Sequence, residues 1–563
     1  MSSSRAVKAS IVALSTLVVA LPASAGAAGP TRPSTSAANV DAPPAGPVSK
    51  VSAQGAGKAA SKGGKGKGHG HGSYAPGARS LGDPLFPQIG NGGYQVKHYR
   101  IELDYDPATN EFEHGTETAI LARATQNLSE LSLDFQDLDV SRVRVNRRSA
   151  DFEQVEATPD LSDNPDVTQP MKLVVTPHDK SRPRAGKKFK VEVSYSGAPQ
   201  HITDPDTSIE GWIRACFPFV PPQTCDGAFV VNEPIGAQSW FPNNNYPTDK
   251  ASFDTEITVP NGKTAVGVGE LRSRKKNRDG TRTWRWHEDD PTATYLTTAT
   301  VGDFDNDFTR MTETSTNKRL DVYNSIDSSS TQAQKDAINA SLARAPGQLN
   351  YLSDLLGRYP LDSIGAVADR AAGVGYALEV QTKPHYAGGF STGNPSINIS
   401  TQLHEIGHMW LGNSVSPATW HEIWFNEGWA TWLEWLWAFE ANGSPDSPAD
   451  NFDALYNDPD FEWDIAPAVL DNDPANLFNG FAVYDRSAMM IEGYRQIVGD
   501  ARFYPFLRTL VAEFRYGNIS LQEFVDLAKD ESGLTGTDLA LLDEYFQQWL
   551  FLEERPMLTP DDF

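Results

Sequence analysis

Two histidines four residues apart, His404 and His408, stand on either side of Glu405 and two apolar positions. On an α-helix, residues i and i+4 lie on the same face, so both imidazoles can bind one Zn²⁺ ion. The glutamate points away from that face and can act as a general base toward water activated by the metal. The pattern H-E-x-x-H therefore indicates a zinc hydrolase. Its alternative interpretation is a pair of ordinary core histidines on an apolar helix.

A third ligand is available at Glu427, nineteen residues after His408. The range 423–441 around it is rich in Trp, Leu and Ala and contains no Pro, which predicts a second helix. Catalytic zinc sites use three protein ligands and keep the fourth position for water, whereas structural sites normally use cysteines and fill all four. Two neutral imidazoles and one carboxylate would leave a net charge of about +1, which acidifies bound water toward a pKa of about 7.

These motifs resemble those of the M1 family of zinc aminopeptidases. The matching segments are H-E-I-G-H-M-W at 404–410, F-N-E-G-W-A-T-W-L-E at 425–434, E-P-I-G-A-Q-S-W-F-P at 233–242 and V-Y-D-R at 483–486. Together with G-N-G-G-Y at 90–94, they follow the family's order from about residue 85 to the C-terminus. The resemblance implies a zinc-dependent aminopeptidase that hydrolyses N-terminal residues from peptides.

The resemblance also implies a role for each matching residue. The residues implied to bind one Zn²⁺ are His404, His408 and Glu427. Glu405 is then the general base, and Tyr484 donates a hydrogen bond to the oxyanion that forms when water attacks the peptide carbonyl. Glu434 lies seven residues after Glu427 on the same helical face, where it either orients a zinc-binding histidine or is a solvated carboxylate.

In this family, carboxylates recognise the free N-terminus of the substrate. The resemblance assigns this role to Glu379 and Glu233, and it places Ala377 in the substrate-binding site. The family segment G-A-M-E-N corresponds here to Tyr-Ala-Leu-Glu-Val at 376–380, so its first, third and last positions differ. A negative pair would match the desolvated α-ammonium group and hold it one residue from the metal.

The altered segment leaves two other functions open. A zinc endopeptidase without a strict requirement for a free N-terminus would result if 376–380 no longer selects the amine. The other alternative is a non-catalytic peptide-binding protein on the same scaffold. A degenerate scaffold, however, has no physical reason to keep three metal ligands, a general base and an oxyanion donor together.

The first 25 residues predict a Sec-type signal peptide. Arg5 and Lys8 precede an apolar stretch at 11–21, and Ala-Ser-Ala at 23–25 predicts cleavage after Ala25. Residues 26–84, which are dominated by Ala, Gly, Pro, Ser and Lys, predict a disordered linker. No other segment offers an apolar run long enough to span a membrane. We therefore expect a secreted protein without a stable membrane anchor.

The net charge limits the partners that we expect, and the two cysteines predict a disulfide. The formal net charge is −25, which disfavours nucleic acid and anionic membranes as partners. The chain has two cysteines, Cys216 and Cys225, which in an exported protein predict one local disulfide, with metal binding as the weaker alternative. Nothing in the sequence indicates the oligomeric state.

The coarse pattern predicts a multidomain α+β protein. Alternating, β-branched runs such as 94–105, 116–125, 189–195 and 251–259 predict an all-β domain over 85–310. Helical patterns at 333–356, 401–411, 488–497, 503–514 and 539–551 predict a mainly α-helical, thermolysin-like zinc peptidase domain over 311–563. Since the sequence stops soon after the last predicted helix, we expect a short form that lacks the family's C-terminal helical domain and has a more open cleft.

Overall fold

The computed structural model describes residues 73–217, 222–371, 373–387 and 396–563. The predicted signal peptide and the first part of the predicted linker, 26–72, lie outside the described residues. The rest of that linker is folded, because β1 (Ala75–Pro76) pairs with β5 (Leu128–Asp134) and Gly77 N donates to Glu130 O at 2.9 Å. The expected disorder therefore does not extend over the described residues of this segment, from residue 73 on. An edge strand supplies backbone partners to a segment whose composition alone predicts disorder.

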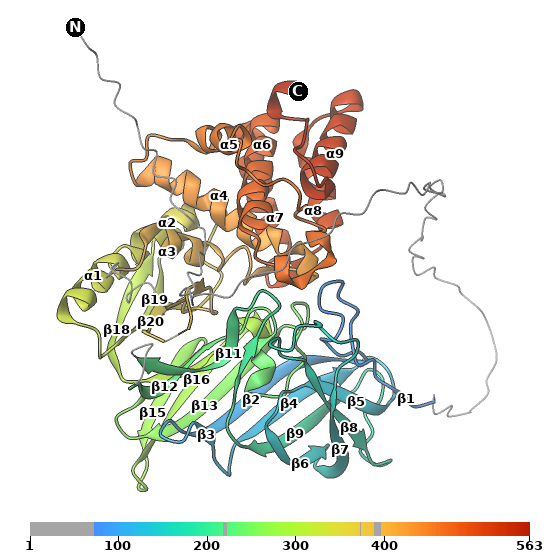
Figure 1. Cartoon of the computed structure of the whole chain (residues 1–563), viewed down its shortest axis with the longest axis vertical. Coiled ribbons are helices and arrows are strands. Elements are labelled where there is room, and N and C mark those ends of the chain that lie inside the picture. Colours follow the sequence, from blue (N-terminus) through green and yellow to red (C-terminus); the bar gives the residue numbers. More distant parts are fainter. Residues whose placement is uncertain (1–72, 218–221, 372, 388–395) are drawn as a thin grey trace, which may run out of the picture. The chain divides into compact units, whose positions relative to one another are not determined.

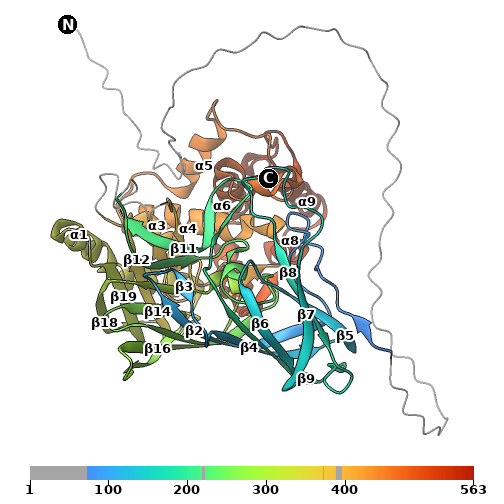
Figure 2. The same cartoon turned by 60° about the horizontal axis from the view of Figure 1, so that its bottom comes forward.

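A twelve-stranded, mostly antiparallel sheet dominates the N-terminal region (Figures 1 and 2). Its strand order is β1-β5-β8-β7-β6-β9-β4-β2-β13-β16-β15, with β3 paired to β2. The bounds are β2 (Tyr94–Asp106), β3 (Glu111–Phe112), β4 (Glu117–Ala124), β6 (Asp139–Val145), β7 (Arg148–Glu156), β8 (Met171–Pro177), β9 (Lys188–Ser196), β13 (Ala251–Pro260), β15 (Glu270–Lys276) and β16 (Thr281–Thr292). Buried and half-buried side chains alternate along β13, as expected when one face of a strand packs on the core. This region confirms the predicted all-β fold.

A second sheet completes the β region. Its order is β10-β11-β12-β17-β14, formed by β10 (His201–Thr203), β11 (Ile209–Phe217), β12 (Thr224–Val231), β17 (Ala299–Gly302) and β14 (Thr264–Gly267). The predicted disulfide between Cys216 and Cys225 is present and joins the paired strands β11 and β12.

A five-stranded sheet begins the C-terminal region. Its order is β18-β19-β20-β22-β21, formed by β18 (Phe304–Glu313), β19 (Lys318–Asp327), β20 (Ser363–Ala368), β22 (His385–Tyr386) and β21 (Ala377–Leu378). The domain boundary expected at residue 310 falls inside β18, so the transition lies between β17 and β18. β23 (Val415–Pro417) and β24 (Gly517–Ile519) form a separate parallel pair.

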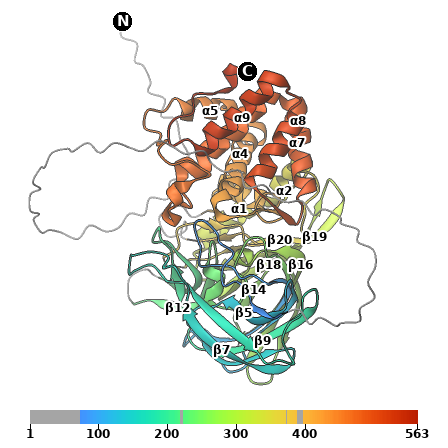
Figure 3. The same cartoon turned by 90° about the vertical axis from the view of Figure 1, so that its right-hand side faces the viewer.

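Helices make up most of the chain that follows. Their bounds are α1 (Gln332–Leu342), α2 (Ala345–Leu356), α3 (Ile399–Gly407), α4 (Trp424–Ala441), α5 (Pro448–Tyr456), α6 (Ser487–Val498), α7 (Asp500–Glu513), α8 (Leu521–Ser532) and α9 (Gly536–Phe551). Figure 3 shows α4, α7, α8 and α9 gathered in one bundle. The predicted helix over 333–356 is in fact two helices, because Pro346 occupies the first turn of α2 and ends the preceding helix. None of the described helices is long and apolar enough to cross a membrane.

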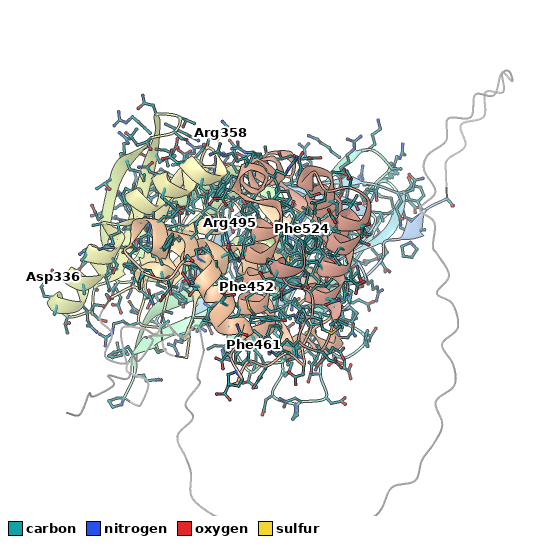
Figure 4. All side chains as sticks on the ribbon, turned by 90° about the horizontal axis from the view of Figure 1, so that it is seen from above. Asp336, Arg358, Phe452, Phe461, Arg495 and Phe524 are labelled. Carbon is teal, nitrogen blue, oxygen red and sulfur yellow. A yellow bond between two sulfur atoms is a disulfide. The ribbon has the colours of Figure 1, made fainter. Side chains whose placement is uncertain are left out.

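Aromatic side chains fill the core between these helices. Trp429 and Trp432 of α4 both contact the ring of Phe503 in α7, at 6.0 and 5.2 Å between ring centroids. Phe452 of α5 and Phe524 of α8 belong to the same core and are labelled in Figure 4. Large buried rings remove much apolar surface from water, so this core holds α4 firmly against its neighbours.

Candidate active site

The three predicted metal ligands meet in one buried cluster. His404 lies in α3, His408 is the residue that directly follows this helix, and Glu427 lies in the first turn of α4. Glu427 Oε2 is 3.0 Å from His404 Nε2 and 3.5 Å from His408 Nε2. The side chain of Asn398 accepts a hydrogen bond from Ser400 N and caps the start of α3. Packing of α3 on α4 thus brings the two motifs together.

Hydrogen bonds at Nδ1 orient both imidazoles. His404 Nδ1 donates to Glu434 Oε1 at 2.7 Å, and His408 Nδ1 donates to Leu411 O at 3.1 Å. A proton on Nδ1 leaves the Nε2 lone pair of the neutral ring free, which is what a metal ligand requires. Glu434 therefore contacts a predicted zinc ligand, and its other oxygen accepts from Ser400 Oγ.

The donor set fits one Zn²⁺ ion. Two Nε2 lone pairs face a carboxylate oxygen, and a cation among these acceptors relieves their mutual repulsion. Tetrahedral ligands about 2.0–2.1 Å from zinc lie roughly 3.3 Å apart, close to the separations of 3.0 and 3.5 Å between the ligand atoms. Across the part of the chain that the structure describes, no other group of His, Cys, Asp and Glu side chains is arranged to hold a metal.

Two buried glutamates at the cluster differ in protonation. Burial acts to raise the pKa of Glu427, but the neighbouring His408 and His404 outweigh it and lower this pKa to about 2. Glu427 is therefore ionised, as a ligand must be. Burial raises the pKa of Glu405 to about 8, against the opposing effect of both histidines. A Zn²⁺ ion would add positive charge and bring the pKa of Glu405 down from this raised value, so that it could act as a base.

Removing the carboxylate of Glu434 is expected to weaken zinc binding. The Glu434→Ala variant loses the acceptor that fixes His404, and loss of such a partner typically lowers metal affinity about 10–100-fold. Competition with a zinc chelator measures this affinity. Glu440→Ala is the matched control, because Glu440 lies on the same helix but accepts from Tyr351 OH and touches no ligand. Equal affinities of the two variants would contradict the orienting role.

Tyr484 lies in a short π-helix, Gly480–Arg486, that leads into α6. Its ring stacks on that of His404, with 6.2 Å between centroids and 22° between planes. Arg486 ends the π-helix and is fully buried. Its guanidinium donates to Trp549 O and Gln548 O, both at 2.9 Å, and so ties the segment to the C-terminal end of α9. The structure thus places the predicted oxyanion donor beside the metal cluster.

The two predicted amine anchors are both buried close to the metal cluster. Burial and the neighbouring Glu379 and Glu427 carboxylates raise the pKa of Glu233 well above its usual value. Glu233 and Glu379 each keep one buried oxygen, Oε1, without a hydrogen-bond partner among the described residues. Buried carboxylate oxygens without donors are costly, and an ammonium group would supply the missing donors. Ala377 lies half-buried in the edge strand β21, and its predicted contact with substrate stays a prediction.

Sequence reasoning missed the loop after α3, which links a metal ligand to an amine anchor. Asn413 N donates to His408 O at 2.8 Å, and Asn413 Nδ2 donates to Glu379 O at 2.8 Å. Lys250 reaches this loop from the β region, and its Nζ donates to the carbonyl oxygens of Asn413, Ser414 and Gly517 at 2.9, 3.0 and 2.7 Å. Asn413 stands close to the histidine motif, but nothing in the local sequence points to Lys250.

Loss of the Lys250 amino group is expected to destabilise the fold. In Lys250→Met three carbonyls lose their donor, which should lower the free energy of unfolding by about 2–3 kcal/mol. Burial lowers the pKa of Lys250 to about 7. Between that pH and its ordinary pKa of 10.5, the unfolded state binds more protons, so the contribution of Lys250 to stability rises with pH. Urea titrations at several pH values should show this rise in the parent and not in the variant.

Lys97→Met, at an exposed lysine of β2, is the control for this variant. Its free energy of unfolding should stay within about 0.5 kcal/mol of the parent. Equal losses in the two variants would show that Lys250 does not hold the loop.

Comparison with known proteins agrees with this geometry. The model of the peptidase M1 N-terminal domain matches residues 95–296, and that of the peptidase family M1 domain matches residues 391–549. Aminopeptidase M1-B of Oryza sativa subsp. japonica is 27% identical over 54% of this chain and 35% of its own length. Leucine aminopeptidase 2 of Yarrowia lipolytica is 24% identical over 71% of this chain and 58% of its own length. The chain thus spans less than two thirds of either relative.

A solved structure shares the fold over nearly its full length. The M1 zinc metallopeptidase from Deinococcus radiodurans superposes with a TM-score of 0.69 at 23% identity, over 85% of this chain and 99% of its own. Both family models match in the expected order, one on the β region and one on the helical region that holds the metal cluster. The chain therefore belongs to peptidase family M1.

Proposed function

We propose that the protein is a zinc-dependent aminopeptidase that acts on peptides outside the cell. The observation that carries this proposal is the pair of buried carboxylates, Glu233 and Glu379, each with an oxygen that lacks a donor and both close to the metal cluster. Such a pair suits a substrate ammonium group better than the uncharged backbone in the middle of a peptide. The predicted signal peptide supports action outside the cell.

The residues around the cluster have different roles in hydrolysis. When bound, Zn²⁺ would supply Lewis acidity toward the attacking water and the scissile carbonyl. Glu405 takes the proton from the water and delivers it to the departing amine. The Tyr484 hydroxyl donates to the oxygen that becomes negative during the attack. Glu233 and Glu379 hold the α-ammonium group, so that the first peptide bond is the one presented for cleavage.

A peptide and its N-acetylated twin test the proposal. Tyr-Ser-Ala is a suitable probe, since it is the substrate named for a similar M1 structure. We expect release of tyrosine from the free peptide and no measurable cleavage of the acetylated one, because acetylation removes the charge that Glu233 and Glu379 neutralise. In Glu379→Gln, KM for the free peptide should rise by about tenfold or more.

Two other results of this test would favour different functions. Equal cleavage of both peptides would overturn the aminopeptidase assignment and favour the endopeptidase. Stoichiometric zinc together with binding but no cleavage of either peptide would favour the non-catalytic peptide-binding protein.

A further inference from the structure

Apart from the active site, a positively charged surface lies at the ends of β6, β7, β8 and β9. These strands carry no active-site residue. The segments 142–148 and 178–190 hold ten Lys and Arg side chains and one acidic residue, Asp179. The whole chain, in contrast, has a net charge of −25. Figures 1 and 2 show the four strands next to one another, and β15 and β16 form the opposite end of the sheet order. Lys and Arg side chains are thus concentrated here on an acidic protein, as they also are at residues 272–278 in and after β15.

Strand pairing brings the two segments together and leaves a concavity between them. Asn146 Nδ2 donates to Ser181 O, and Asn146 N donates to Lys190 O, both at 2.9 Å. Beside this contact lies an open cavity of about 710 Å³. The side chains that line it include three cations, Arg148, Lys180 and Arg182, one carboxylate, Asp179, and the hydroxyls of Ser149 and Thr176. The surface is therefore a basic cavity with hydroxyl groups on its walls.

Four of the ten cations form ion pairs within the protein: Arg142 with Glu117, Arg144 and Lys190 with Glu192, and Arg182 with Asp179. Arg182 pairs with Asp179 at 2.9 Å, but its Nε is buried and has no acceptor among the described residues. No ion pair to another described residue forms at Arg148, Lys180, Arg147, Arg184, Lys187 or Lys188. Scattered surface lysines would serve solubility, but the acidic remainder of the chain already does so. A concentrated, unpaired set of cations instead matches an anionic ligand.

We propose that this basic cavity binds an anionic polysaccharide. The cations are spread along two segments, 142–148 and 178–190, which suits a chain with repeated charges better than a single small anion. The hydroxyls of Ser149 and Thr176 suit sugar hydroxyl groups. His178 contributes the one aromatic ring on the cavity wall, so a nucleic acid would find a single imidazole there and no extended surface for base stacking. This surface would hold the protein at an anionic matrix, independently of its catalytic activity.

Binding to defined polymers tests the proposal. The probes are heparin, a sulfated polysaccharide, and polygalacturonate, a carboxylated one, with single-stranded oligodeoxythymidylate for comparison. Calorimetry with the full chain should give a Kd for at least one polysaccharide that weakens as salt rises. Replacing Arg148, Lys180 and Arg182 together with serine should weaken this binding by about tenfold or more. The melting temperature and peptide hydrolysis of this variant should match those of the parent.

A second triple variant has the same change in net charge. It carries serine at Arg274, Lys275 and Lys276, which are exposed in β15 at the far end of the sheet order, and it should bind the polysaccharide like the parent. Equal losses in the two variants would overturn the proposal, since total charge and not this cavity would then govern binding. So would the absence of binding to both polysaccharides, or tighter binding to the oligonucleotide.

Discussion

Replacing Glu405 with glutamine is expected to lower kcat by about three orders of magnitude. Glutamine keeps the shape of the side chain but cannot take a proton, and a positioned general base typically contributes 10²–10⁴-fold to the rate. Zinc content should stay stoichiometric, because Glu405 is not in the ligand set of His404, His408 and Glu427. Steady-state kinetics together with metal analysis of the same sample separate these two effects.

The pH profile gives a second check on this variant. A protonated Glu405 cannot accept a proton, so kcat/KM of the parent should fall as pH falls through the pKa of this group. That acidic limb should lie below pH 8, the value that burial produces before the positive charge of zinc is added. The pH profile of the residual activity of Glu405→Gln should lack this acidic limb. Glu553→Gln, at an exposed position, should behave like the parent. Near-normal turnover in Glu405→Gln would exclude Glu405 as the base.

The metal cluster could be predicted because its ligands belong to short sequence motifs whose spacing is informative. Residues i and i+4 share a helix face whatever the tertiary structure, so His404 and His408 could be paired from spacing alone. The prediction of Glu427 as a ligand required one more step, because a second helix had to be recognised from its composition. Glu434 lies seven residues after Glu427 in α4, and both carboxylates contact His404. Its contact with His404 depends on how α3 packs against α4, which spacing does not determine.

The supporting contacts were not predictable because they join distant parts of the chain. Lys250 and Asn413 lie 163 residues apart, and Arg486 holds the end of a helix that begins fifty residues later. In each case a cation is satisfied by main-chain carbonyls, which carry no signature in the sequence. The basic cavity is a similar case, since the Lys- and Arg-rich segments are visible in the sequence but only the pairing of β7 with β8 shows that they form one surface. The missed break between α1 and α2, by contrast, had a visible signal in Pro346.

Replacing Tyr484 with phenylalanine is expected to lower kcat by about 10²–10³-fold with little change in KM. The variant loses one hydroxyl donor, and loss of a single oxyanion donor has this effect in other hydrolases. The ring should keep its stacking on His404, at 6.2 Å between centroids, so metal geometry is preserved. An interaction present mainly in the transition state lowers kcat and kcat/KM together, which distinguishes it from loss of substrate binding.

Inhibitor binding separates the oxyanion role of Tyr484 from a packing role. A phosphinic peptide carries a negative oxygen where the oxyanion forms, and Tyr484→Phe should weaken its binding by nearly the same factor as kcat. A product amino acid, which lacks that tetrahedral oxygen, should bind both proteins about equally. Tyr504→Phe, at a half-buried tyrosine of α7 with no ligand contact, controls for general loss of a hydroxyl. A fall in kcat without weaker binding of the phosphinic peptide would mean that Tyr484 positions His404 through its ring and donates nothing to the oxyanion.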